Sequence, residues 1–332
     1  MKNYILLLLC MLSLASCRKE TASFDGTSIE EQYSDFTVLE PFSSSKDSVA
    51  FASGESVQFS AKFNKTVTWT ITITGQTSHA QKILTGQSKI IDASNGFWNG
   101  STTQFPMFKT EKCIAQLTIQ DITESYQVAV KIKSIKVNNG LVIADFETGL
   151  NSAWTKFIQS GANMDFGVKT DTLAPQGAKY LKMAGTVNWD YLIGLIDFPA
   201  TAYGGVTVPL SANPDDVYFN CLIYGVPNTN ESLVLFQIKE DENANGSFNA
   251  SNEDEYDLQV TVNWEGWKLV SFKYADIPSL VNGQPGTPKG NSQHNPDKIS
   301  KISMLHLANP ANGFASCKLD YIIFTNGKPI EP

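Results

Sequence analysis

The sequence is poor in residues that cross-link or ligate. Of its five cysteines, only Cys113, Cys221 and Cys317 lie beyond residue 17. An odd number without tight spacing excludes a disulfide framework and a zinc pattern. Cys113 and Cys221 stand in alternating apolar runs, which predicts buried thiols. A bridge between Cys221 and Cys317 is the alternative.

Catalytic patterns are also missing. The three histidines, His79, His294 and His306, have no second histidine or cysteine at ligand spacing. We therefore interpret each as exposed to solvent or hydrogen-bonded within the protein, and not as a metal ligand. The sequence has no Gly-x-Ser-x-Gly elbow, no Cys/His nucleophile arrangement and no glycine-rich phosphate loop. Acidic residues are numerous enough for a glycosidase pair, but most lie in polar loops. The sequence therefore favours binding over catalysis.

Positive charge and long apolar runs are lacking as well. The net charge is -8, from 33 acidic and 25 basic residues. Because phosphate binding needs clustered Lys and Arg, nucleic acid is not an expected partner. After the N-terminal run, no apolar stretch approaches the length of a membrane span. Any membrane attachment is therefore expected at the N-terminus alone.

The N-terminus has the pattern of a secretory signal. Lys2 precedes an apolar run that is short for a membrane span and ends in Leu14, Ala15, Ser16 and Cys17. This ending resembles the bacterial lipobox, which implies a signal peptide over 1–16, cleavage before Cys17 and lipidation of that cysteine. Residues 18–20 resemble the surface-export signal of Bacteroidota-type lipoproteins. The resemblance implies an outer-membrane lipoprotein facing the cell exterior; an ordinary signal peptide is the alternative.

The chain from residue 17 to 138 is interpreted as a tether and one domain. Residues 17–35 are polar and lack periodicity, as in a flexible tether. Residues 36–138 alternate between apolar and polar positions, which predicts half-buried strands of antiparallel sheets. About seven short strands in about a hundred residues are typical of an immunoglobulin-like β-sandwich. The alternating segments are residues 57–63, 67–73, 113–119 and 126–132.

Two tryptophans of this domain differ in setting. Trp69 lies on the apolar side of its run and fits a sandwich core. Trp98 lies in the segment 96–101, which resembles a loop of the immunoglobulin-like spacer domains of Bacteroidota surface lipoproteins. Trp98 could bind a ligand, but we favour the interpretation that it packs this loop against the sandwich.

A second all-β domain is expected over 139–332. A turn signal at 138–140 ends the first pattern. The strand density that follows is typical of a β jelly-roll sandwich. The fold class predicted for the whole chain is therefore all-β, an immunoglobulin-like sandwich followed by a jelly roll. Strands are expected at residues 180–183, 217–224, 233–239, 256–264, 267–274, 302–307 and 319–324.

Three motifs of the second domain carry a resemblance. The opening Asp145-Phe146-Glu147, the pair Trp264 and Trp267, and the closing segment 319–324 resemble galactose-binding-like jelly rolls, a fold of many carbohydrate-binding modules. The whole plan resembles glycan-binding lipoproteins encoded with polysaccharide-uptake systems. This implies a non-enzymatic protein that captures polysaccharide, beside an outer-membrane transporter and without a required cofactor. The alternatives are a structural or adhesive lipoprotein that binds a protein, and a glycoside hydrolase or lyase.

The acidic loop 241–253 predicts calcium. Asp241, Asn243 and Asn245 stand at positions 1, 3 and 5 of an EF-hand-type loop, and Gly246 stands at position 6. In such a loop the side-chain oxygens at alternate positions converge on one hard cation, and the glycine permits the sharp turn. Ser247 and the displaced acid Glu253 complete the expected ligands. A hairpin rich in Asn and Gly, without a metal, is the alternative.

A second calcium position is implied only by the jelly-roll resemblance. Modules of this kind hold a structural calcium between their opening and closing strands. Glu147 and Asp320 occupy the matching positions, with Asp145 as a substitute. Ordinary polar residues at strand ends are the alternative.

Exposed aromatics are the expected sugar platform, since rigid rings stack on sugar C–H patches with little loss of entropy. The leading candidate is the run of Asn188, Trp189, Asp190 and Tyr191, whose two aromatics share one face if the run is extended. Tyr203 and Trp154 are expected to extend this site, with Tyr224 and Phe248 as further members. Trp264 and Trp267 are assigned to the core.

Overall fold

The computed structural model describes residues 35–332 apart from 173, 188–190, 227–231, 282–283 and 309–312. Its regular structure is nearly all strand, so the all-β fold class is confirmed. Among the described residues no helix is long and apolar enough to span a membrane. The short 3₁₀ helices are η1 (Phe51–Ser53), η2 (Ala200–Tyr203), η3 (Pro214–Asp216), η4 (Tyr274–Asp276) and η5 (Pro296–Lys298).

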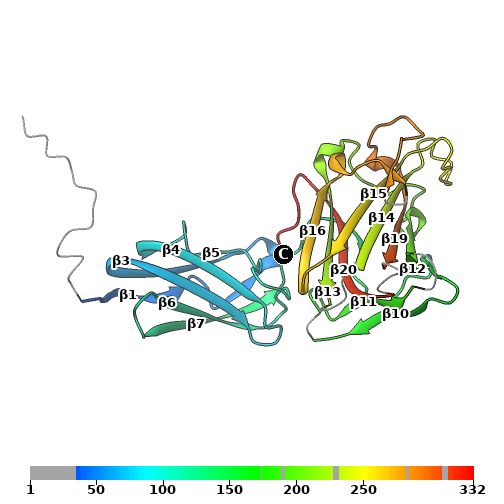
Figure 1. Cartoon of the computed structure of the whole chain (residues 1–332). Coiled ribbons are helices and arrows are strands. Elements are labelled where there is room, and N and C mark those ends of the chain that lie inside the picture. The colour runs from blue at the N-terminus through cyan, green and yellow to red at the C-terminus, as the bar shows by residue number, and fades with distance from the viewer. Residues whose placement is uncertain (1–34, 173, 188–190, 227–231, 282–283, 309–312) are drawn as a thin grey trace, which may run out of the picture.

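The first domain is one curled sheet around one core (Figure 1). The strand order is β1-β3-β6-β7-β2, with β4 and β5 also paired to β3. All these pairs are antiparallel except β2 with β7, which is parallel. The strands are β1 (Val38–Ser44), β2 (Ser48–Ala50), β3 (Val57–Gly75), β4 (Gln81–Ile91), β5 (Phe97–Trp98), β6 (Lys112–Ile119) and β7 (Ser125–Ser134).

Strand β3 joins two predicted strands into one. The alternating runs 57–63 and 67–73 are continuous through its 19 residues, and both place their apolar residues in the core. Trp69 is buried there, as expected, and its ring lies over Gly86 of β4, where an added Cβ would come within 2.4 Å of the indole. A larger residue at position 86 would therefore displace this tryptophan.

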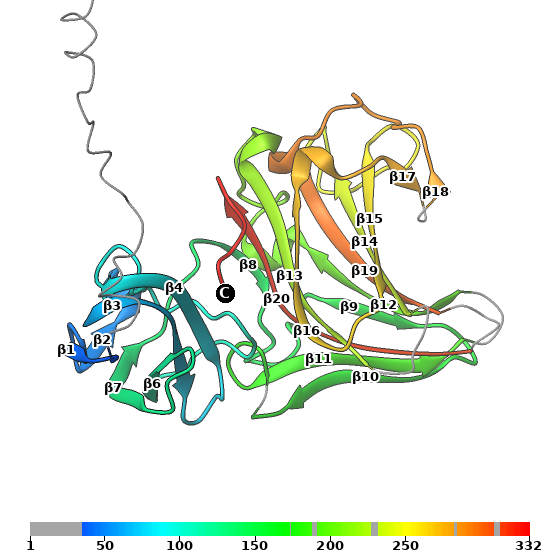
Figure 2. The same cartoon turned by 60° about the vertical axis from the view of Figure 1, so that its left-hand side comes forward.

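The second domain is an antiparallel sandwich of two sheets (Figure 2). We call the sheet β10-β11-β20-β13-β16, to which β8 is added, the docked sheet, and the sheet β15-β14-β19-β12-β9 the open sheet. The strands are β8 (Gly140–Ala144), β9 (Thr155–Ile158), β10 (Asn163–Thr170), β11 (Lys179–Thr186), β12 (Leu192–Pro199), β13 (Val217–Gly225), β14 (Ser232–Glu240), β15 (Glu255–Val262), β16 (Gly266–Lys273), β17 (Leu280–Val281), β18 (Gln284–Pro285), β19 (Ile299–Leu307) and β20 (Phe314–Asn326).

The core of this domain lies between the two sheets and is rich in aromatic residues. Phe219 packs against Phe236 of the opposite sheet with ring centroids 4.8 Å apart. Cys221 and Cys317 are buried here as free thiols, and Cys113 is a buried free thiol of the first domain. The buried-thiol interpretation is therefore confirmed, and the two cysteines of the second domain form no bridge.

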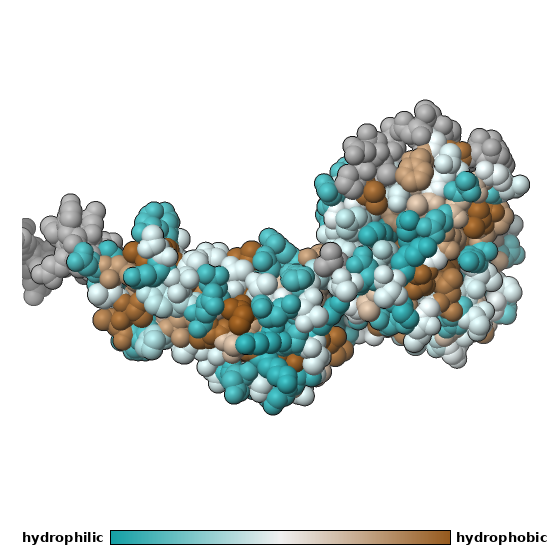
Figure 3. Space-filling model, turned by 90° about the horizontal axis from the view of Figure 1, so that it is seen from below, coloured by the Kyte–Doolittle hydropathy of each residue, from teal (hydrophilic) through white to brown (hydrophobic). Residues whose placement is uncertain are grey.

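The first domain packs on the outer face of the docked sheet. Met107 of the first domain is buried in one cluster with Leu222, Tyr321 and Ile323 on the outer face of this sheet. The N–H of Met107 also donates to the carbonyl of Pro175 over 2.7 Å. Figure 3 shows the result as two lobes of an elongated molecule.

Candidate functional site

Among the described residues, the outer faces of the two sheets in the second domain differ in whether the first domain covers them. The outer face of the docked sheet is occupied in part by the first domain and by Ile330 of the C-terminal segment. In Figures 1 and 2 the open sheet lies on the side away from the first domain. The outer face of the open sheet is therefore the face to search for a site.

Strand alternation identifies the residues of this outer face. Ile196, Phe236 and Met304 point into the core, so their neighbours along each strand point outward. The strand registers then align one outward row of polar side chains across the whole sheet. We call this row the polar band; its members are Thr155, Asp197, Ser303, Gln237 and Asp257.

The polar band lies between an apolar row and a charged row. The apolar row contains Leu195 and Leu305 and ends in Phe157, whose side chain is 49% exposed. The charged row contains Lys239 and Lys301. The band crosses all the strands of the open sheet, so its length is four strand spacings of about 4.8 Å, or about 19 Å.

Ion pairs hold the long side chains of the charged row. Lys301 Nζ lies 3.4 Å from Asp197 Oδ2, and Lys239 Nζ lies 3.5 Å from Glu255 Oε2. Gln237 donates to Glu255 Oε1 over 3.2 Å. These contacts fix the orientation of Asp197 and Gln237. Gln237, Ser303 and Asp257 are 6%, 2% and 0% exposed, so the accessible end of the polar band is at Thr155 and Asp197.

The run that was expected to form the sugar platform is described only at its last member. Asn188, Trp189 and Asp190 lie outside the described residues. Tyr191 is 53% exposed immediately before β12, and its carbonyl accepts a hydrogen bond from Ala308 N over 2.9 Å. Tyr191 therefore lies at one end of the open sheet, beside the end of β19, and not within the polar band.

Two of the expected extensions, Trp154 and Tyr203, are partly buried and pack against the core of the second domain. The ring of Trp154 packs edge-on against Phe146 and Phe198, at 5.9 and 5.0 Å between centroids. The hydroxyl of Tyr203 donates to the carbonyl of Ile143 over 2.8 Å, and burial raises its pKa well above the ordinary value. A sugar would therefore reach only the exposed part of each ring.

The other aromatics are divided between the two faces. Tyr224 and Trp267 lie on the docked sheet, where their rings are 5.2 Å apart. The assignment of Trp267 to the core was wrong, because this partly buried ring contacts the apolar cluster beneath the first domain on the outer face of the sheet. Trp264 packs against the core of the second domain, as expected. Phe248 lies beside the charged row of the open sheet, with Lys239 Nζ 5.6 Å from its ring centroid.

The loop predicted to bind calcium is a series of side-chain turns. The carboxylate of Asp241 accepts hydrogen bonds from the N–H groups of Asn245 and Gly246, at 3.2 and 2.6 Å. Asn243 and Asn245 each accept from the N–H two residues further on, the second being that of Ser247. Calcium at this loop stays a prediction, since each of these oxygens could also face a cation.

Glu253 closes the same loop from its far end. Its carboxylate accepts from Asn243 Nδ2 and from the N–H of Asn249 at 2.7 Å. These contacts are compatible with the hairpin rich in Asn and Gly, which was the alternative, as well as with a calcium loop.

Glu147 and Asp320 lie close together between the opening and closing strands. Burial, with the neighbouring charges of Glu147 and Asp145, raises the pKa of Asp320 to about 9. Glu147 Oε1 accepts from the N–H of Lys179 over 2.7 Å. The buried Oε1 of Gln176 has no hydrogen-bond partner. Among the described residues no third acid joins Glu147 and Asp320 in a group whose oxygens all lie within 4.8 Å of one another, so calcium between the opening and closing strands stays a prediction.

Comparison with known proteins yields structural similarities alone. No family model matches the chain, and no curated protein matches it. A solved carbohydrate-binding module of the β-sandwich superfamily aligns at 12% identity over 88% of this chain and 98% of its own, with a TM-score of 0.40. The family 11 module of Clostridium thermocellum, solved with a mixed-linked tetrasaccharide, aligns at 16% identity over 57% of this chain and 97% of its own, with a TM-score of 0.38. The family 30 module of a cellulosomal cellulase from the same organism aligns at 15% identity over 57% of this chain and 99% of its own, with a TM-score of 0.36.

Proposed function

We propose that this protein binds a glycan chain along the outer face of the open sheet. The observation that carries the proposal is the polar band, which crosses five strands beside an apolar row. A sugar chain offers both hydroxyl groups and C–H patches. The accessible end of the band, Thr155 and Asp197, supplies hydrogen-bonding groups for the former, and Leu195 with Phe157 beside it supplies apolar contact for the latter.

The spacing of the carboxylates supports binding rather than hydrolysis. Asp197 and Asp257 are the acids of the polar band, and two strands separate them. Three strand spacings place their backbones about 14 Å apart, which is longer than the about 5–9.5 Å between the carboxyl groups of a glycosidase pair. The band can therefore hold a sugar chain without presenting this acid pair to one glycosidic bond.

The proposal includes the cell surface as the place of binding. The lipobox-like segment that ends at Cys17 supports attachment through a lipid, and residues 18–20 support export to the outer face. A tethered binder needs only modest affinity, since many copies raise the effective concentration of sites at the surface. In this proposal the first domain is a spacer, and the captured polysaccharide passes to an uptake system.

Variants of the polar band test the site. Asp197→Ala and Gln237→Ala are expected to weaken binding of the cognate polysaccharide about tenfold or more, because a hydrogen bond to a charged or oriented group contributes about 1.5–3 kcal/mol. Affinity electrophoresis of the mature chain against a polysaccharide panel measures this. Gln259→Ala is the matched control, since Gln259 is exposed on the same face outside the band.

Two outcomes would count against this assignment. Loss of retention in Tyr191→Ala with normal retention in both band variants would move the site to the end of the sheet. Failure of the unaltered chain to bind any polysaccharide, together with capture of a defined surface protein, would favour the adhesive alternative.

Cys17→Ala tests the lipid anchor. The variant is expected to lose incorporation of a labelled fatty acid and to leave the membrane fraction, because no other anchor is apparent in the sequence. Metabolic labelling and fractionation of the producing cells give the result. A label retained by the variant would exclude Cys17 as the acceptor.

A further inference from the structure

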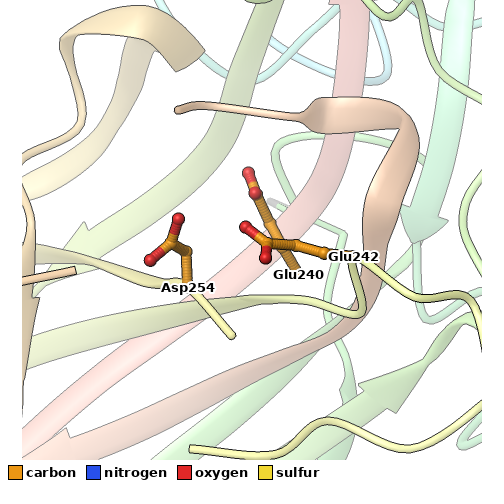
Figure 4. Close-up of side chains that lie close together, drawn as sticks. All are labelled: Glu240, Glu242 and Asp254. Carbon is orange, nitrogen blue, oxygen red and sulfur yellow. The ribbon is translucent and has the colours of Figure 1, made fainter. Parts of the chain in front are cut away.

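Three carboxylates gather at one end of the open sheet, outside the proposed glycan site. Glu240 ends β14, Glu242 follows it, and Asp254 directly precedes β15. One oxygen of each lies within 4.8 Å of the others, and their side chains converge in Figure 4. Glu240 and Asp254 are fully buried. We call these three residues the acid triad.

One loop covers the acid triad and donates to every member. Asp254 accepts from the N–H groups of Gly290 and Ser292, both at 2.8 Å. Asn291 N donates to Glu242 Oε1 over 3.0 Å, and Asn295 N donates to Glu240 Oε1 over 2.7 Å. Backbone dipoles of segment 290–295 therefore favour negative charge in the triad.

Two buried oxygens at the triad have no hydrogen-bond partner. One is Glu240 Oε2, on a side chain with no exposed surface. The other is the hydroxyl of Tyr256, a residue that is 1% exposed; this hydroxyl lies beside the carboxylate of Asp254 without a hydrogen bond of good geometry, and Glu240 and Glu242 are its other acidic neighbours. Stacking on His294, with 3.9 Å between ring centroids, fixes the ring of Tyr256. Unpartnered buried oxygens beside carboxylates destabilise the fold unless another ligand satisfies them.

Lysine and arginine do not supply that partner. Among the described residues, no basic side chain forms an ion pair with the acid triad, and Tyr274 is the one side chain that donates to Glu240. Two further carboxylates lie within the same 4.8 Å.

We propose that the acid triad, with the hydroxyl of Tyr256, binds a divalent cation of the calcium type. All the available donors are oxygens, which hard cations prefer, and the irregular arrangement from a strand end and two loops suits calcium better than the strict octahedron of magnesium. The cation would connect the ends of β14 and β15 to segment 290–295, which forms the rim of the domain.

This site differs from the one expected in loop 241–253. Glu240 and Glu242 flank Asp241 in the sequence, and Asp254 follows Glu253. Because side chains alternate in direction along an extended chain, the residues next to the predicted ligands point to the other side. Asp241 and Glu253 accept hydrogen bonds within their own loop, whereas the acid triad faces segment 290–295.

Calorimetric titration of the metal-stripped mature chain with calcium chloride tests the proposal. We expect saturable binding of one ion and a higher thermal midpoint when calcium is present. Glu242→Gln is expected to weaken binding at least tenfold while leaving the fold intact, because Glu242 is only half-buried. Asp241→Asn is the matched control at the neighbouring position and is expected to bind like the unaltered chain.

Glu240→Gln provides a second, independent readout. Glutamine keeps the shape of the side chain and its hydrogen bonds to Tyr274 and Asn295 but cannot supply the carboxylate that a cation needs, so the metal-free variant is expected to unfold at about the same temperature as the metal-free unaltered chain. Its thermal midpoint should no longer respond to calcium. The proposal is overturned if calcium produces no heat, or if Asp241→Asn abolishes binding while Glu242→Gln retains it. No glycan takes part, so the result is independent of the proposed function.

Discussion

Trp98→Ala is expected to lower the free energy of unfolding of the first domain by about 4 kcal/mol, near the middle of the range for large-to-small changes at buried aromatics. Trp98 has no exposed surface. Its ring packs edge-on between Phe51 and Phe108, with centroids 4.8 and 4.9 Å away. Removing the indole would leave a cavity between these two rings, and a small domain cannot close such a cavity without moving its strands.

Two further features tie Trp98 to its loop. The indole N–H donates to the carbonyl of Ser101 over 3.0 Å, so alanine would also leave that buried acceptor unpaired. Gly100 has a positive φ of 87°, and a Cβ there would come within 2.7 Å of the Phe51 ring. The loop is therefore shaped around the aromatic cluster, as expected when packing rather than ligand binding explains the tryptophan.

Urea denaturation of the mature chain, followed by circular dichroism, measures the effect. Phe97→Ala is the matched control: its ring is 46% exposed on the same two-residue strand, so we expect a change of less than about 0.5 kcal/mol. Glycan binding by the second domain should be unchanged in both variants. A Trp98→Ala protein of normal stability that no longer binds its ligand would make Trp98 a binding residue instead.

The strands that could be predicted are those with one clear apolar side. Residues 217–224 and 233–239 were expected as strands and became β13 and β14 with ends shifted by a residue or two. Strand β9 was missed because all its residues are exposed. Strand β12 was missed because Leu192, Ile193 and Leu195 interrupt the alternation. The alternation therefore fails for opposite reasons: the edge strand β9 buries neither side, and β12 carries apolar residues on both sides.

The polar band could not be found from the sequence. Its members come from five strands, and the nearest two along the chain, Gln237 and Asp257, are 20 positions apart. Only the strand order brings them into one row. Local motifs led instead to Tyr191 and its neighbours, because aromatic residues two apart can be recognised within a single segment.

The acid triad lies beside the loop in which the sequence predicts a calcium site, but it consists of other residues. The spacing of Asp241, Asn243 and Asn245 indicated a cation loop between β14 and β15. In the structure the carboxylate oxygen without a hydrogen-bond partner belongs to Glu240, the residue before Asp241. Glu240 is the last residue of β14, and its side chain is buried. The donors of segment 290–295 lie about 40 positions further along the chain, beyond the reach of any spacing rule.

His306 is expected to make the second domain sensitive to mild acid. The side chain lies between the two sheets without exposed surface, with Nδ1 3.5 Å from Cys317 Sγ. Nε2 has no hydrogen-bond partner. Burial lowers the pKa of His306 from 6.5 to about 4, against a weaker opposing contribution from the backbone of Ala315.

The direction of the effect follows from proton binding. Between about pH 6.5 and 4 the unfolded chain takes up a proton on His306, whereas the folded chain does not, so stability is lost as the pH falls through this window. The difference of about 2.5 in pKa corresponds to a loss of about 3 kcal/mol. Above pH 6.5 both states hold the neutral ring, and the contribution is constant.

His306→Leu should remove this loss, because leucine fills a similar volume and does not titrate. The quantity to compare is the difference in free energy of unfolding between the variant and the unaltered chain at each pH, from urea denaturation. Carboxyl groups such as Asp320 titrate in both chains and cancel in this difference. His79→Asn is the control, since His79 is exposed in a turn with φ of 61°, where asparagine is tolerated. A difference that stays constant from pH 7 to 4 would mean that His306 is protonated in the folded core, and the packing of that ring against Cys317 would then have to include a counter-charge.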